Sequence, residues 1–240
     1  MKRLILASLV LISLFVAPNT IYAEGADYYD QAKEYITAGK YKEAINSLNK
    51  AIEKDPKSSK AYYVRGIAYD KVGRYEEAVR DFNKAIEIDP KNAYAYAGRG
   101  IFYGKVLGDY QKAIKDLNKA EELNPSLPQI YANRGTAYLS TGKNEEAIRD
   151  YSKTIEMRPD IPGVYFNRGM AHLNLKKYQQ AVDDFSKGLE LNPNIPPAYY
   201  FRGLAYEKLG NEKKAMSDMK IAAKAGVREA QDYLKSRGIQ

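Results

Sequence analysis

Residues 61–90 read AYYVRGIAYDKVGRYEEAVRDFNKAIEIDP, and the same residue types return at nearly the same spacing along most of the chain. The clearest marker of this period is a proline whose copies lie 34, 35, 34 and 34 residues apart. These prolines are Pro56, Pro90, Pro125, Pro159 and Pro193. A fixed period of this length predicts an array of similar modules, each of them one supersecondary structure.

The period divides the chain into six repeats. The residues of each repeat are numbered so that the recurring proline stands at position 32. Their ranges are 25–58, 59–92, 93–127, 128–161, 162–195 and 196–225, and the sixth lacks the proline. Position 4 is tyrosine and position 20 is alanine in every repeat, while position 8 is alanine in the first repeat and glycine in the others. The third repeat has one extra residue before Gly108, which is expected to lengthen its first helix or the turn that follows.

These positions resemble the tetratricopeptide repeat family, in which an aromatic residue, glycine and tyrosine precede alanine, a large apolar residue and a closing proline. In the second repeat the matching residues include Tyr62, Gly66, Ala78 and Phe82. The chain departs from the family pattern in carrying tyrosine rather than tryptophan at position 4 and arginine rather than leucine at position 7. The resemblance implies an all-α superhelix, a solenoid of six helix-turn-helix repeats.

Each repeat also contains two helical stretches when it is analysed by its residues alone. In the second repeat they run from about residue 60 to 72 and from about 75 to 88, because Gly73 and Pro90 end them. One unit cannot bury its apolar stripe alone, so stacked units are expected to share a continuous core. Residues 226–240 contain a last amphipathic helix, at about Arg228–Ser236, which is predicted to cap the stack.

Residues 1–23 have the layout of a secretory signal peptide. A basic start is followed by the uncharged apolar run Leu4–Val16 and by the small residue Ala23 before the expected cleavage. An uncleaved membrane anchor is the alternative, but thirteen helical residues reach roughly 20 Å, short of the ~30 Å hydrocarbon core. The sequence therefore predicts an exported protein, periplasmic or secreted, without stable membrane insertion after cleavage.

Composition excludes several classes of function. The chain has no cysteine, which removes disulfides and thiolate metal sites. Removal of Lys2 and Arg3 with the signal peptide lowers the net charge from +8 to +6, and charges of both signs are interleaved, which does not favour nucleic-acid binding. The only histidine, His172, stands at position 11, where most repeats have tyrosine, and is interpreted as a core residue. We expect no enzymatic activity, no cofactor and no metal.

Arginine at position 7 has two interpretations. It accompanies an aspartate at position 23 in every repeat but the first, where Gln31 and Ser47 replace both members together. This joint loss favours a structural pair between the two helices of a repeat, with the bidentate geometry that arginine allows; a ladder of arginines for an anionic ligand is the alternative. The expected pairs are Arg65 with Asp81, Arg99 with Asp116, Arg134 with Asp150, Arg168 with Asp184, and Arg202 with Asp218.

In the family that this chain resembles, the first helices line a concave groove that binds peptides. Transferred to this chain, the resemblance implies an uneven groove with small residues in its middle. Tyrosines and lysines lie on the side of the first repeats, and asparagines and aromatic residues lie on the side of the later ones. Glycine inside a helix costs about 1 kcal/mol relative to alanine, so the bare middle is a candidate docking trough; neutral surface variation is the alternative. The candidate residues are Tyr29, Lys33, Lys60, Tyr63, Tyr94, Ala97, Gly98, Gly104, Asn133, Phe166, Asn167, Tyr200 and Phe201.

The sequence thus predicts a non-enzymatic exported scaffold or adaptor that binds a protein or peptide in the groove of a repeat superhelix. The binding prediction depends on the resemblance and on groove composition, because a fold alone does not specify a function. Two alternatives stay open. One is a structural envelope protein that assembles as a homo-oligomer, and the other is an accessory subunit of an envelope enzyme.

Overall fold

The computed structural model describes residues 18–239, and within these residues all regular secondary structure is helical. Residues 1–17, with the apolar segment of the expected signal peptide, lie outside the described part. The helices are α1 (Pro18–Thr37), α2 (Tyr41–Lys54), α3 (Ser59–Lys71), α4 (Tyr75–Ile88), α5 (Ala93–Lys105), α6 (Tyr110–Leu123), α7 (Pro128–Ser140), α8 (Asn144–Met157), α9 (Pro162–Asn174), α10 (Tyr178–Leu191), α11 (Pro196–Lys208), α12 (Glu212–Lys224) and α13 (Arg228–Ser236).

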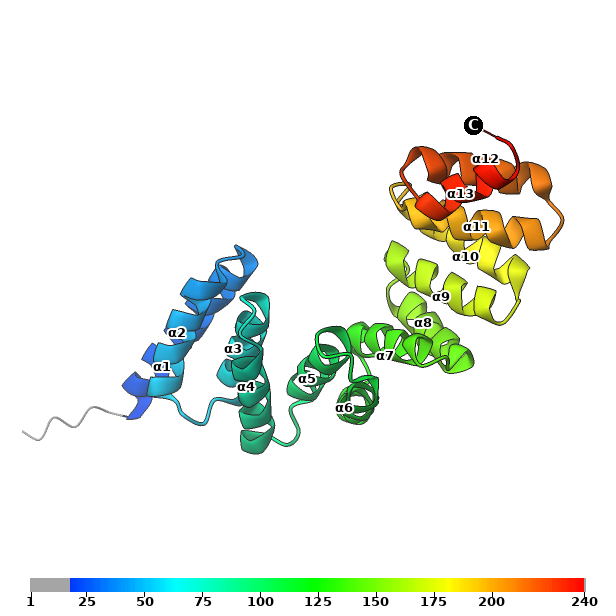
Figure 1. Cartoon of the computed structure of the whole chain (residues 1–240). Helices are drawn as coiled ribbons and strands as arrows, with labels where there is room; N and C mark the ends of the chain where they lie inside the picture. Colours follow the sequence, from blue (N-terminus) through cyan, green and yellow to red (C-terminus); the bar gives the residue numbers. More distant parts are fainter. Residues whose placement is uncertain (1–17, 240) are drawn as a thin grey trace, which may run out of the picture. The chain divides into compact units, whose positions relative to one another are not determined.

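The helices pack as consecutive pairs, and the chain divides into two compact units, one ending at Asp89 and one beginning at Pro90 (Figure 1). The first unit contains the pairs α1–α2 and α3–α4, which meet where α2 contacts α3. The second unit contains the pairs α5–α6, α7–α8, α9–α10 and α11–α12, and α13 packs on α12. This arrangement confirms the predicted all-α fold of stacked helical pairs.

Each pair depends on a close approach of its two helices at position 8. A Cβ atom built on Gly66 would lie 2.8 Å from the Phe82 ring, and one on Gly169 would lie 2.8 Å from the Phe185 ring. Real Cβ atoms essentially never come so close. The small residue at position 8 therefore makes room for the large residue at position 24, and Phe82 and Phe185 are both almost fully buried.

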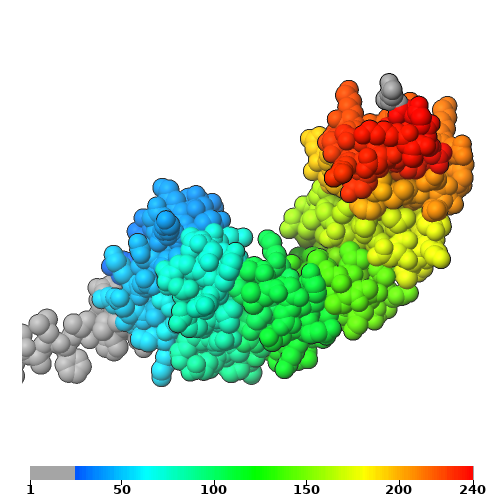
Figure 2. Space-filling view, viewed as in Figure 1, coloured from blue at the N-terminus to red at the C-terminus, as the bar shows by residue number. Residues whose placement is uncertain are grey.

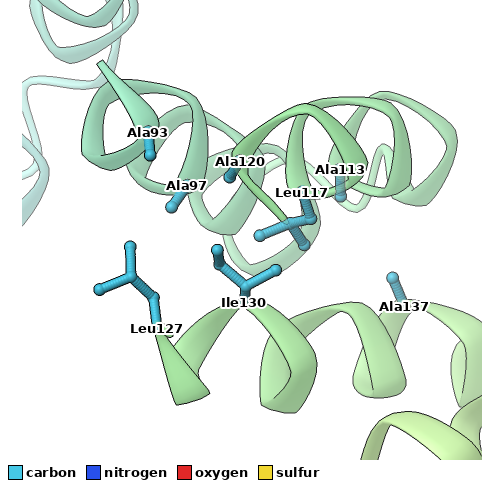
Figure 3. Close-up of a cluster of buried hydrophobic side chains, with 8 residues drawn as sticks. All are labelled: Ala93, Ala97, Ala113, Leu117, Ala120, Leu127, Ile130 and Ala137. Atoms are coloured by element: carbon cyan, nitrogen blue, oxygen red, sulfur yellow. The ribbon is translucent and has the colours of Figure 1, made fainter. Parts of the chain in front are cut away.

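Neighbouring repeats are joined by apolar clusters, of which the one between repeats 3 and 4 is drawn in Figure 3. Leu127, the residue before α7, and Ile130 of α7 point toward Ala97 and Leu117 of the preceding pair. Ile130 is 0 % exposed, and burying such a side chain contributes roughly 2 kcal/mol. Ala97 is 3 % exposed. The prediction that Ala97 lines the groove is therefore wrong, because Leu127 and Ile130, where the third repeat joins the fourth, cover it.

The turn inside each pair requires a left-handed residue at position 15. Gly73 and Gly142 adopt φ angles of 79° and 76° there, whereas Lys176 adopts 59° in the fifth repeat. An L-residue in this conformation costs about 1 kcal/mol or more. The extra residue of the third repeat also falls in this turn, because α5 has the same 13 residues as α3 and α7.

The structure brings together all five arginine–aspartate pairs across the two helices of their repeats. In the fourth repeat, Arg134 donates from Nε and Nη2 to the two carboxylate oxygens of Asp150, both at 2.8 Å. The corresponding Nε contacts are 2.7 Å for Arg65 with Asp81, 2.7 Å for Arg99 with Asp116, 2.9 Å for Arg168 with Asp184 and 2.8 Å for Arg202 with Asp218. In the first repeat the neutral pair meets at the same place, where the Ser47 hydroxyl donates to Gln31 Oε1 at 2.7 Å.

These arginines also bind the preceding repeat, a contact that the sequence did not indicate, as Arg65, Arg134, Arg168 and Arg202 show. The Nη1 atom of the arginine donates to the side-chain oxygen of an asparagine or serine at position 25 of the preceding repeat. The partners are Asn49 for Arg65 at 2.8 Å, Asn118 for Arg134 at 2.8 Å, Ser152 for Arg168 at 3.0 Å and Ser186 for Arg202 at 3.1 Å. Each of these guanidinium groups thus links both helices of its own repeat to the repeat before it. Because side chains of the protein take up these donors, the geometry favours the structural pair over a ladder for an anionic ligand.

Removing one partner of a buried pair leaves the other charge without compensation. We expect Asp218→Ala to lower the free energy of unfolding by about 3 kcal/mol, because Arg202 then loses its carboxylate. The loss for Asp150→Ala is expected to be smaller, since Glu121 also forms an ion pair with Arg134. Chemical denaturation of both variants measures the difference.

The first repeat supplies the matched control for this experiment. Its glutamine and serine occupy the same two positions without charge, so the double variant Arg202→Gln/Asp218→Ser is expected to recover most of the loss. A single Asp218→Ala variant that unfolds like the wild type, or a double variant no better than the single one, would show that the pair does not stabilise the repeat.

Candidate partner-binding groove

In the second unit, the repeats follow one another in a curved stack, from the green to the red part of Figure 2. In this unit, the first helices of the four repeats are α5, α7, α9 and α11. They carry most of the predicted groove residues. Those that are half-buried, and so offer part of their surface, are Gly98, Gly104, Asn133, Phe166, Asn167, Tyr200 and Phe201. Tyr94 is more open, at 46 % exposed.

A hollow of about 320 Å³ lies among α5, α6 and α7. It brings together two of the predicted groove residues, Gly104 and Asn133. The complete lining is Gly100, Ile101, Gly104, Lys105, Tyr110, Ala113, Asn133, Thr136 and Ala137. A Cβ atom on Gly104 would lie 3.3 Å from the Cβ atom of Ala113, so Gly104 both keeps the hollow open and allows α5 to approach α6 closely.

Beside the hollow, the buried hydroxyl of Tyr151, at position 24 of the fourth repeat, contacts a residue of its lining. Tyr151 is 0 % exposed, yet its hydroxyl donates to Thr136 Oγ1 at 3.1 Å. Burial raises the pKa of the Tyr151 phenol to about 12, against the lowering effect of its interactions with Thr136 and Asn167. The phenol therefore stays protonated and orients these two groove side chains. Tyrosine where the other repeats have leucine, phenylalanine or methionine was the signal available in the sequence.

Farther along the second unit, the predicted aromatic residues pack on one another. The ring centroid of Phe166 lies 5.8 Å from that of Phe185 and 6.0 Å from that of Phe201. Tyr200 meets Phe201 edge-on at 5.1 Å. Such pairs contribute about 1 kcal/mol each beyond their buried area. These rings therefore form a rigid apolar wall whose outer edges are accessible.

Four predicted residues belong to the first unit instead. Tyr29 and Tyr63 are half-buried there, while Lys33 and Lys60 are exposed. The Lys33 amine lies 3.1 Å from the Asp30 carboxylate and 5.6 Å from the centre of the Tyr29 ring. Lys33 is thus already paired on its own helix, which weakens it as a docking group for a partner carboxylate.

His172 lies in the core of the fifth repeat, as its position in the register predicts. Its Nε2 is 3.6 Å from Asp184 Oδ2, and its Nδ1 is buried without a hydrogen-bond partner. Burial lowers the pKa of His172 below its ordinary value of 6.5, against the opposing effect of Asp184. The imidazole is therefore neutral at pH 7 and packs in place of the tyrosine of other repeats.

Residues 18–239 contain no group of three or more histidine or acidic side chains arranged to hold a metal ion. No helix in the same part of the chain is both long enough and apolar enough to cross a membrane.

Family models for the tetratricopeptide repeat match the chain from residue 32 to residue 224 without a gap. The matched ranges are 59–92 and 162–195 for one model, 32–73, 107–142 and 135–176 for a second, 82–115 for a third and 196–224 for a fourth. The chain therefore belongs to the tetratricopeptide repeat family, whose members bind protein partners. No curated protein matches the chain significantly.

Solved structures share the fold at low sequence identity. PilF of Pseudomonas aeruginosa is 18 % identical with a TM-score of 0.80, over 90 % of this chain and 99 % of PilF. PilW, described as a type IV pilus biogenesis factor, is 20 % identical with a TM-score of 0.75, over 88 % and 98 %. YrrB, described as a TPR protein with an unusual peptide-binding site, is 24 % identical with a TM-score of 0.70, over 78 % and 97 %.

The buried His172 predicts a pH-dependent stability. The unfolded chain, in which the histidine pKa is near 6.5, binds a proton before the folded chain does. The free energy of unfolding is therefore expected to fall as the pH drops from about 7.5 to about 5.5. His172→Tyr, which restores the residue of the other repeats, is the control and is expected to remove this slope. Denaturation curves of both proteins across the range measure it, and equal slopes would contradict the prediction.

Proposed function

We propose that this protein is a non-enzymatic scaffold that binds an extended segment of another protein along the first helices of its second unit. The observation that carries the proposal is the hollow among α5, α6 and α7, which joins Gly104 and Asn133 on one accessible surface. Ligand sites are concave, largely apolar and fitted with few polar groups, and this hollow has each of these properties.

The neighbouring surface also favours a peptide ligand. Asn133 and Asn167 present side-chain amides, the groups that pair with the backbone of an extended chain, and the Phe166 and Phe201 edges offer apolar contact. Apolar contacts of this kind supply most of the affinity of an interface, while charges at its rim set the rate of association. YrrB, which has the same fold, is described as having an unusual peptide-binding site.

A photo-crosslinking amino acid tests where the partner binds. Placed at Asn133 in the full chain and irradiated in cells, it is expected to form a defined adduct with a partner protein. The same amino acid at Lys153, an exposed residue of α8 whose amine pairs with Glu156 at 2.9 Å, is the control and is expected to form none. Adducts of equal yield at both positions, or none at Asn133, would contradict binding in the groove.

Export is the second part of the proposal, and its support is the sequence of residues 1–23. The full chain, expressed in a bacterial host, is expected to be recovered outside the cytoplasm with Glu24 as its first residue, as measured by intact mass. Leu11→Arg, which interrupts the apolar run, is expected to retain the uncut chain in the cell. An uncut wild-type chain in the cytoplasm would contradict export.

A further inference from the structure

The hollow among α5, α6 and α7 exists because position 12 of the third repeat has no side chain. Gly104 stands where repeats 4 and 5 have Leu139 and Leu173. Without that side chain, the bottom of the hollow is formed by small residues. These are Gly100 of α5, Ala113 of α6 and Ala137 of α7, and each of them is buried. The hollow is therefore specific to this repeat of the chain.

Its floor and its rim differ in chemistry. The floor consists of these small residues together with Ile101, and it offers carbon atoms without polar groups to satisfy. At the rim, Asn133 Nδ2 donates to the Gln129 carbonyl of its own helix at 2.7 Å, and the Thr136 hydroxyl donates to the Ala132 carbonyl at 2.9 Å. These bonds hold both side chains in place while their oxygens can still accept a hydrogen bond.

Lys105, also at the rim, carries a charge without a partner. Among the described residues, no carboxylate lies within ion-pair distance of its amine, and the side chain is exposed. By contrast, the nearby Lys112 is neutralised by Asp109 at 2.8 Å. An uncompensated cation beside an apolar hollow favours a ligand that combines an apolar group with a negative charge.

We propose that the hollow receives one aromatic side chain of the partner segment, and that an acidic residue next to it in the partner places its carboxylate on Lys105. The inference rests on the proposed function and specifies the partner. A ring fits because it is large and flat, and about 320 Å³ above a floor of glycine and alanine admits it. The amide and hydroxyl oxygens of Asn133 and Thr136 can accept a hydrogen bond from a tyrosine hydroxyl at the same place.

Selection from a random twelve-residue peptide library displayed on phage tests this inference. The purified full chain is expected to enrich peptides that have an aromatic residue within two positions of aspartate or glutamate. In fluorescence anisotropy, alanine in place of that aromatic residue is expected to weaken binding at least tenfold, which corresponds to burial of a large apolar side chain. This arm changes only the peptide, so it does not depend on the folding of a variant.

Two protein variants locate the contact. Gly104→Leu fills the hollow and is expected to abolish binding, with a thermal melt to verify its fold. Lys105→Gln is expected to weaken acidic peptides about threefold to fivefold and to leave their glutamine analogues unchanged, as for an exposed ion pair. Lys208→Gln removes a lysine at the same position 13 of the sixth repeat and serves as the matched control, with no effect expected.

Peptides that bind but lack the aromatic–acidic pattern, or whose binding survives both Gly104→Leu and Lys105→Gln, would overturn the inference and leave groove binding intact. A selection that enriches no peptide would overturn it as well. The crosslinking experiment at Asn133 then decides separately whether the groove binds a partner at all.

Discussion

The close approach of two helices at position 8 is the constraint on which this structure depends. A side chain at Gly66 or Gly169 would overlap the aromatic ring of the facing helix, so the pair closes only when this residue is small. Once closed, the pair presents one apolar face to the next pair, and burial of residues such as Ile130 stabilises the stack. Every later feature, the groove included, is built on this spacing between helices.

The arginine at position 7 helps to fix how neighbouring repeats are oriented, which apolar packing alone would determine less strictly. Its planar donors reach a carboxylate in the same repeat and, as in Arg134 and Arg168, an asparagine or serine in the preceding one. Tyrosine at position 4 lies under the same guanidinium, as in the 5.6 Å contact between Arg134 and Tyr131. Such a buried polar group fixes geometry, because it is satisfied in a single arrangement of the repeats.

The candidate site results from exceptions to the repeat pattern. Gly104 removes a side chain that other repeats have, and Tyr151 brings a hydroxyl to a position that is otherwise apolar. Lys105, at a position where other repeats also have lysine, adds an exposed charge at the rim. Repetition makes most positions interchangeable, so a partner can be distinguished only where one repeat differs from the others. The hollow and its polar rim occur together at one such place, with the Lys105 charge beside them.

The sequence by itself determined the helix pairs, their register and the arginine–aspartate partners, because each of these follows from contacts within one repeat, and those contacts recur with the period. With the family resemblance it also selected Gly104 and Asn133 as groove candidates, and both line the same hollow. Only the tertiary structure decided which groove residues are accessible, that Ala97 is covered by Leu127 and Ile130, and that position 25 binds the next arginine. The exposure of a residue and its contacts between repeats depend on atoms of the neighbouring repeat. The residue pattern of a single repeat contains no information about those atoms.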